Sequence, residues 1–81
     1  MARIVYQAGF VKQLAKLRNP VLEAAIDEKI LHIAAHTEHY KPLRGELKGL
    51  RRVHFGSYVL LYKFSGDTVE IISIDHHDVA Y

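Results

Sequence analysis

The chain has 81 residues, no cysteine and a formal net charge of +2. This length predicts one domain over residues 1–81, and the missing cysteines exclude a disulfide scaffold and a thiolate zinc site. No apolar run approaches the roughly 20 residues that span a bilayer, and no cleavable signal segment is visible. We therefore expect a soluble, cytoplasmic protein without a membrane partner.

The positive charge is concentrated in one segment. Residues 41–63 hold six basic residues and one acid, a net charge of +5, whereas residues 64–81 hold four acids and no Lys or Arg, a net charge of −4. Residues 1–40 contribute the remaining +1. A local positive surface suits a polyanion such as nucleic acid, or an acidic protein segment. The alternative is an ordinary solvated polar face.

The first forty residues predict a strand followed by two helices. Residues 3–7 alternate as a short strand does, and from Ala8 the apolar period becomes helical. Asn19-Pro20 then supplies an N-cap and a first helical residue for the second helix. The apolar stripes are Phe10, Leu14 and Leu17 in the first helix, and Leu22, Ile26, Ile30 and Ile33 in the second. Because one or two residues join the helices, we expect an antiparallel helix hairpin on one face of a sheet.

After a loop over residues 36–49, the chain predicts three strands. Runs rich in β-branched, aromatic and aliphatic residues cover 50–55, 58–64 and 68–74, separated by Gly56-Ser57 and Ser65-Gly66-Asp67. Glycine accepts a positive φ at low cost, so both breaks suit hairpin turns. The predicted fold class is therefore α+β: a strand, an antiparallel helix hairpin and a three-stranded antiparallel meander, in the order β-α-α-β-β-β.

Cationic and titratable groups gather on this meander. Arg52 and His54 share one face of its first strand, and its third strand runs into Asp75-His76-His77. Both faces of the central strand are largely apolar, as in strands buried on both sides. One face must cover the helices, and the other can form the floor of a shallow site beside Arg52 and His54.

Several motifs follow one another in a recognisable order. Lys41-Pro42-Leu43-Arg44-Gly45 precedes Leu50-Arg51-Arg52-Val53, then Gly56-Ser57-Tyr58-Val59-Leu60-Leu61-Tyr62, then Ile74-Asp75-His76-His77, and finally Tyr81. Together with the order of elements, these motifs resemble the RelE/ParE superfamily of toxins from toxin–antitoxin pairs. The resemblance covers essentially the whole chain and is most specific over residues 41–62 and at the end.

The resemblance implies two activities on one fold. RelE-like members cleave messenger RNA, usually in the ribosomal A site, whereas ParE-like members poison DNA gyrase. The RNase reaction needs no metal: a 2′-hydroxyl attacks the adjacent phosphate and leaves a 2′,3′-cyclic phosphate, which requires a base, an acid and cations. The implied partners are a cognate antitoxin and mRNA on the ribosome, with operator DNA reached only through the antitoxin. Neither a cofactor nor a metal is implied.

By position, the resemblance implies catalytic roles for His54, His76, His77 and Tyr81. The basic segment adds RNA or phosphate contacts, for which the candidates are Lys41, Arg44, Lys48, Arg51 and Arg52. Two positions depart from the family pattern, since Val59 stands where an arginine is usual and His77 replaces a tail arginine. Three histidines can still supply a base and an acid, so we predict an mRNA endoribonuclease.

Other interpretations stay open at this point. The loss of arginine at Val59 favours a ParE-like, non-enzymatic gyrase inhibitor, and a catalytically weak toxin could act mainly as an antitoxin-binding co-repressor. His54 alone is also an ordinary surface residue of a strand. His32, His36 and His39 have helical spacing, but no set of carboxylates beside them indicates a zinc site.

Overall fold

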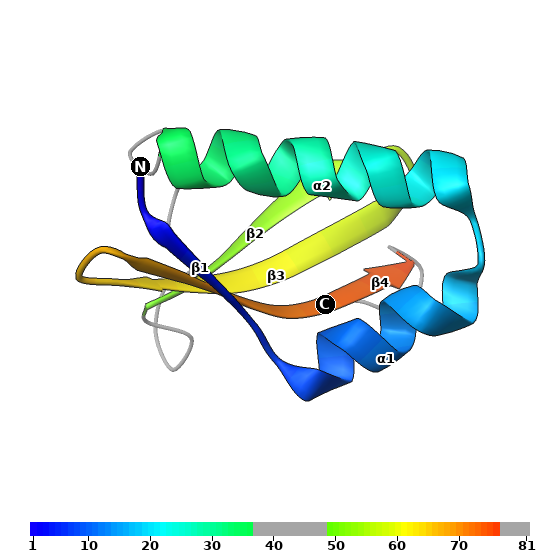
Figure 1. Cartoon of the computed structure of the whole chain (residues 1–81), viewed down its shortest axis with the longest axis horizontal. Coiled ribbons are helices and arrows are strands. Elements are labelled where there is room, and N and C mark those ends of the chain that lie inside the picture. Colours follow the sequence, from blue (N-terminus) through cyan, green and yellow to red (C-terminus); the bar gives the residue numbers. More distant parts are fainter. Residues whose placement is uncertain (37–48, 77–81) are drawn as a thin grey trace.

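The computed structural model describes residues 1–36 and 49–76 (Figure 1). Two helices and four strands follow one another as predicted, and the α+β class is confirmed. The elements are β1 (Arg3–Tyr6), α1 (Ala8–Leu17), α2 (Pro20–Ala35), β2 (Leu50–Phe55), β3 (Tyr58–Ser65) and β4 (Thr68–His76). Most of the predicted loop between α2 and β2 lies outside the described residues.

The four strands form one mixed sheet in the order β1-β4-β3-β2. The pairs β2–β3 and β3–β4 are antiparallel, which confirms the predicted meander. β1 pairs in parallel with β4, from Arg3 opposite Thr68 to Tyr6 opposite Ile71. The last strand, β4, therefore lies beside the first strand, β1. The two edges of the sheet are β1 and β2.

Glycine occupies the first position of both hairpin turns. Gly56 has φ 56° and Gly66 has φ 61°. A two-residue hairpin with glycine first and a positive φ there is one of the turns whose twist matches that of the flanking strands. These turns fix which residues of β2, β3 and β4 face one another.

α2 covers one face of the sheet and supplies most of the helical part of the core (Figure 1). Asn19 caps it as predicted, because its side-chain oxygen accepts a hydrogen bond from the Leu22 amide at 3.1 Å. Ile26, Ile30 and Ile33 are buried, as the apolar stripe predicts. They pack in one cluster with Phe10 of α1 and five sheet residues, Leu60, Tyr62, Val69, Ile71 and Ile74. Neither described helix is long and apolar enough to cross a membrane.

α1 packs against the edge of β4, where β1 has ended (Figure 1). Its predicted apolar stripe of Phe10, Leu14 and Leu17 adjoins the core cluster that also contains the isoleucines of α2. The Gln7 amide donates to the Ile71 carbonyl at 2.9 Å, and three residues further along β4 the Gln13 side chain provides the next contact. The Ile74 amide donates to Gln13 Oε1 at 3.0 Å. A helix side chain thus satisfies a backbone group at the sheet edge.

A β-bulge in β4 decides which residues of its C-terminal half face the helices. Leu61 of β3 opposes Ser73 whereas Tyr62 opposes Ile71, so Ile72 is an extra residue. Val69 and Ile71 are buried in the core, and strict alternation would continue with Ser73 and Asp75. The extra residue moves Ile74 into the core instead, where it is 4% exposed. Ser73 and Asp75 are thereby turned to the opposite face.

Candidate functional site

The candidate site lies on the sheet face that points away from α2, called here the outer face. Directly paired residues of neighbouring strands project to the same side, so the register defines this face. One row across three strands is His54, Val59 and Asp75, and the next is Arg52, Leu61 and Ser73. A third row holds Leu50, Lys63 and Glu70.

The first two rows combine an apolar floor with polar flanks. Val59 is 2% exposed and Leu61 is 8% exposed, so the middle of each row is buried. Arg52 and His54 on β2 are exposed, and Asp75 on β4 is half-buried. As the alternation predicts, Arg52 and His54 share this face with Val59. Arg52, a cation, and His54, a group able to transfer a proton, therefore lie next to one another on β2, beside the buried side chains of β3.

His76 is not brought together with His54, although the sequence groups them in one site. His76 opposes Tyr58, one position along β3 from Val59, and therefore projects to the face that the helices cover. Its ring contacts that of Tyr58 edge to face, with centroids 5.6 Å apart. The bulge at Ile72 is the physical reason, because the extra residue exchanges the faces of all residues that follow it.

Arg51 also projects to the helix-covered face. It opposes Tyr62, and its guanidinium carbon lies 5.2 Å from the centre of the Phe64 ring, a cation–π distance. Of the five predicted phosphate-binding residues, Arg52 alone is described on the outer face. The other three, Lys41, Arg44 and Lys48, lie outside the described residues, as do His77 and Tyr81.

Sequence reasoning missed two residues of the site, Asp75 and Gln13. Gln13 Nε2 donates to Asp75 Oδ1 at 2.9 Å, while Gln13 Oε1 accepts from the Ile74 amide. The carboxylate in the row of His54 is therefore fixed by a side chain of α1. The available signal was the presence of two polar residues, Ser73 and Asp75, among the isoleucines of β4. The face to which they project could not be assigned, because the sequence does not reveal the bulge.

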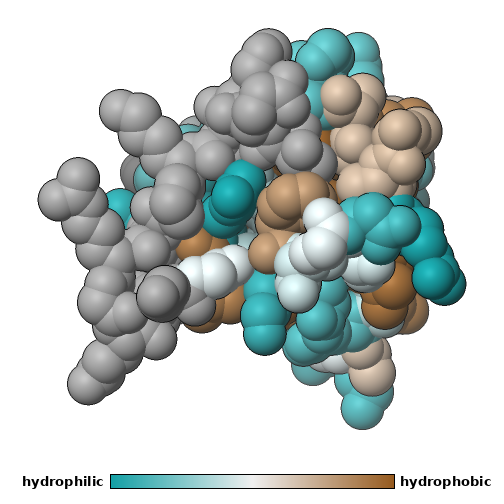
Figure 2. All heavy atoms as spheres, turned by 90° about the vertical axis from the view of Figure 1, so that its left-hand side faces the viewer, coloured by the Kyte–Doolittle hydropathy of each residue, from teal (hydrophilic) through white to brown (hydrophobic). Residues whose placement is uncertain are grey.

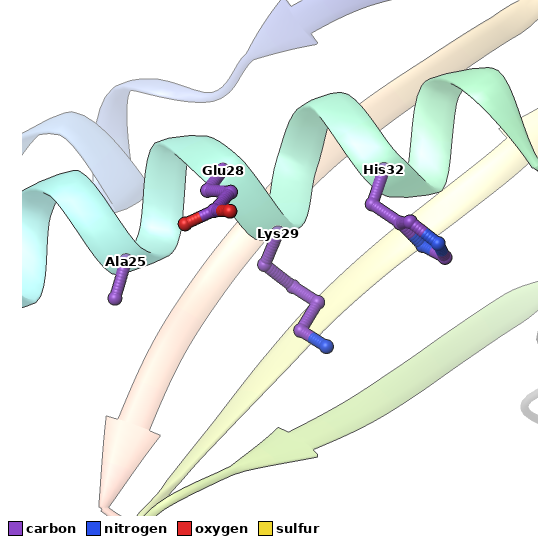
Figure 3. Close-up of a pocket in the computed structure, with 4 residues that line it drawn as sticks. All are labelled: Ala25, Glu28, Lys29 and His32. Carbon is purple, nitrogen blue, oxygen red and sulfur yellow. The ribbon is translucent and has the colours of Figure 1, made fainter.

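Described residues also line two pockets away from the outer face. One is lined by Ala25, Glu28, Lys29 and His32, and Figure 3 shows all four side chains leaving α2. The other lies between the start of β1, the end of α2 and the β3–β4 turn. Figure 2 shows the end of the molecule with this turn, where hydrophilic and hydrophobic residues are interspersed. Within the described part of the chain, no group of three His, Cys, Asp or Glu residues could hold a metal ion.

Comparison with known proteins identifies the family. The family model described as the ParE toxin of type II toxin-antitoxin system, parDE, matches residues 4–81. A curated protein of Methanocaldococcus jannaschii, described as "Putative toxin RelE4", is 34% identical over an alignment of 74 residues that covers 88% of this chain and 78% of that protein.

Solved structures agree with this assignment. A chain of the toxin–antitoxin complex RelBE2 from Mycobacterium tuberculosis superposes with a TM-score of 0.78 at 28% identity, covering 93% of this chain and 96% of that one. A chain of the E. coli DinJ-YafQ complex gives a TM-score of 0.65 at 19% identity over 100% and 99% of the two chains, a likeness of fold alone. The protein described here therefore belongs to the ParE toxin family of type II toxin–antitoxin systems, within the RelE/ParE superfamily.

Proposed function

We propose that this toxin is a metal-independent endoribonuclease that cleaves mRNA on the ribosome in the cytoplasm. The observation that carries the proposal is the pair of Arg52 and His54 on the outer face, beside the buried floor of Val59 and Leu61. Exposed polar side chains above a rigid strand floor can hold an RNA phosphate while a proton is moved. The similarity to an archaeal protein described as a RelE toxin supports this activity over gyrase inhibition.

The proposed reaction is attack of a ribose 2′-hydroxyl on the adjacent phosphate. The new bond between the 2′-oxygen and phosphorus closes a 2′,3′-cyclic phosphate, and the bond to the 5′-oxygen breaks. Arg52 contacts the phosphate and stabilises the charge that grows on its oxygens in the transition state. His54 transfers a proton, since histidine changes its charge near neutral pH. His77 and Tyr81 retain the catalytic roles that the resemblance implies.

Val59 marks how this chain differs from the family pattern. An arginine at that position would extend over the outer face in the row of His54, whereas valine adds only an apolar floor. Arg52 and the predicted basic residues Lys41, Arg44 and Lys48 therefore carry more of the phosphate binding in this proposal. The expected consequence is weaker stabilisation of the transition state than an additional fixed cation would give.

A cognate antitoxin is proposed as the protein partner, with operator DNA bound only through it. Structural neighbours from M. tuberculosis and E. coli were solved as toxin–antitoxin complexes. The surface of α1 and α2 also exposes Val11, Val21 and Leu31 by 52%, 80% and 53%. A partner that covers such side chains and carries acidic residues would suit the net charge of +5 over residues 41–63.

The proposal is tested by primer extension on ribosome-bound mRNA incubated with the purified toxin. We expect new 5′ ends with the wild type and about 10²-fold slower cleavage with His54→Ala, the usual loss for a proton-transfer group. His32→Ala, an exposed histidine on α2, is the matched control and should cleave at the wild-type rate. Equal cleavage by His54→Ala and His32→Ala, with both variants folded, would overturn the assignment.

A gyrase inhibitor is the second candidate function. The buried valine at position 59, without the cation that RNase members carry, favours it, as does the match to the ParE family model. A supercoiling assay with DNA gyrase separates the two. Inhibition of supercoiling without any cleavage of ribosome-bound mRNA would replace the RNase proposal with the gyrase one.

A further inference from the structure

Cleavage through the 2′-hydroxyl needs two proton transfers, one from the attacking oxygen and one to the leaving oxygen. Within residues 1–36 and 49–76, His54 is the histidine on the outer face, because His76 projects to the helix side and His32 and His36 belong to α2. We propose that the Asp75 carboxylate is the second proton-transfer group and that Gln13 is its positioning residue. This inference rests on the proposed RNase function and adds a catalytic residue to it.

The register sets the two groups on opposite sides of one floor residue. His54 and Asp75 both oppose Val59, from β2 and from β4. Neighbouring strands are about 4.8 Å apart, so the two backbones are separated by about 9.6 Å. In-line displacement at phosphorus requires the attacking and leaving oxygens to lie on opposite sides of the phosphate. A base and an acid at the two ends of this row fit that requirement, with the small, buried Val59 between them.

Asp75 is held in a fixed orientation by two linked hydrogen bonds. The Ile74 amide donates to Gln13 Oε1 at 3.0 Å, which leaves the amide nitrogen of Gln13 to face the carboxylate. Gln13 Nε2 donates to Asp75 Oδ1 at 2.9 Å, so within the described part of the chain the other carboxylate oxygen remains for a substrate proton. The reverse orientation of Gln13 would set its carbonyl oxygen against the carboxylate and leave the Ile74 amide without this acceptor. The bulge at Ile72 completes the placement by turning Asp75 to the outer face.

The ordinary chemistry of a carboxylate and an imidazole assigns the two roles. An ionised carboxylate is the base, so Asp75 accepts the proton of the 2′-hydroxyl as the 2′-oxygen bonds to phosphorus. His54 in its protonated form is the acid and gives its proton to the 5′-oxygen as the phosphorus–oxygen bond breaks. The two groups then regain their starting states by proton exchange with water. The other described charged groups on this face are Arg3 of β1, Arg52 of β2, Lys63 of β3 and Glu70 of β4, and α1 contributes the uncharged Gln13.

The structure contains a matched control for Asp75. Glu70 is a second carboxylate of β4 on the outer face, and it also accepts a hydrogen bond from a glutamine, Gln7 Nε2. It opposes Lys63, two rows away from His54. Glu70→Gln therefore removes the same charge from the same strand and face without touching the row of His54.

The experiment measures single-turnover cleavage of ribosome-bound mRNA between pH 5 and 9 for the wild type, Asp75→Asn, Asp75→Glu, Gln13→Ala and Glu70→Gln. Asp75→Asn keeps an oxygen for Gln13 Nε2 and is expected to cleave about 10²-fold slower or worse. The loss should persist across this whole pH range, because the amide of asparagine cannot accept the proton of the 2′-hydroxyl. Asp75→Glu should recover part of the rate and Glu70→Gln should match the wild type. Gln13→Ala should slow cleavage in the wild-type background but add little to the loss in Asp75→Asn, because Gln13 acts through Asp75.

The experiment distinguishes a wrong assignment of Asp75 from a wrong proposal of RNase activity. If the wild type cleaves, His54→Ala does not, and folded Asp75→Asn keeps the wild-type rate and pH profile, Asp75 is not the base and the RNase proposal stands. If the wild type leaves the mRNA intact under all conditions, the RNase proposal and the role of Asp75 are both overturned. Thermal melting of each variant confirms that the changes in rate belong to folded protein.

Discussion

Tyr58 and His76 are cross-strand partners whose rings meet edge to face, with centroids 5.6 Å apart and planes inclined by 72°. Tyr58 packs against the hydrophobic core, so this pair lies on the side of the sheet that the helices cover. Val59, the next residue, opposes His54 on the outer face. Two histidines that the sequence places in one site therefore occupy opposite faces.

This separation predicts unequal effects of two histidine substitutions. His54→Ala should slow cleavage of ribosome-bound mRNA by about 10²-fold, because it removes a proton-transfer group. His76→Ala should change the rate by less than about twofold, since its ring lies against Tyr58 on the other face. The two variants are compared at equal folded concentration. A loss as large for His76→Ala as for His54→Ala would contradict the separation of the two faces.

Val59→Arg should affect stability and activity in opposite directions. Val59 is 2% exposed, so a charged side chain there loses solvation and the melting temperature should fall. A guanidinium that reaches past the row of His54 and Asp75 would add a cation close to the reacting phosphate, and the rate per folded molecule should rise. The measurement is cleavage normalised to the folded fraction from a thermal melt. Val59→Met controls for the added volume, and an arginine variant no faster than the methionine variant would disprove the effect of charge.

The meander could be predicted from the sequence because its turn residues and its β-branched runs agree with one another. The bounds of β2 match the prediction, and the start of α2 follows from Asn19 and Pro20. The placement of α1 at the edge of β4 depends on a tertiary hydrogen bond from Gln13 to the Ile74 amide, which no periodicity encodes. The parallel pairing of β1 with β4 is likewise a contact between the two ends of the described chain.

The candidate site was predicted in part, for a related reason. Alternation in β2 assigns Arg52 and His54 to one face, and the register agrees. Alternation in β4 fails at Ile72, because three consecutive apolar or small residues, Ile71, Ile72 and Ser73, do not reveal which one bulges. That single residue separates His76 from His54 and brings Asp75 to the outer face.

Burial predicts a large loss of stability from truncation of α2 in the core. Ile30 is 1% exposed within the cluster that joins the helices to the sheet, so Ile30→Ala should lower the free energy of unfolding by about 2–5 kcal/mol. Val21, on the same helix, is 80% exposed, and Val21→Ala should change it by less than about 0.5 kcal/mol. Urea unfolding followed by circular dichroism measures both. Comparable losses in the two variants would mean that α2 does not pack on the sheet through Ile30.

The N-cap of α2 predicts a smaller and separate effect. Asn19 Oδ1 accepts from the Leu22 amide at 3.1 Å, and an alanine would leave that amide without a side-chain partner. Asn19→Ala should lower the free energy of unfolding by about 1 kcal/mol, while Asn19→Asp should retain most of it. The comparison uses the same urea titration. A larger loss for the aspartate than for the alanine would show that the cap does not act through this oxygen.

The most direct test of the RNase account is the chemistry of the cleaved ends, measured with divalent ions removed from the toxin. Isolated ribosome-bound mRNA complexes are mixed with EDTA-treated toxin in buffer that holds only the magnesium the ribosome needs, and the products are analysed by mass spectrometry. The account predicts 2′,3′-cyclic phosphate and 5′-hydroxyl ends, produced at the same rate by EDTA-treated and untreated toxin and lost with His54→Ala. Products with 5′-phosphate and 3′-hydroxyl ends would contradict it, because such ends require attack by water instead of the 2′-hydroxyl.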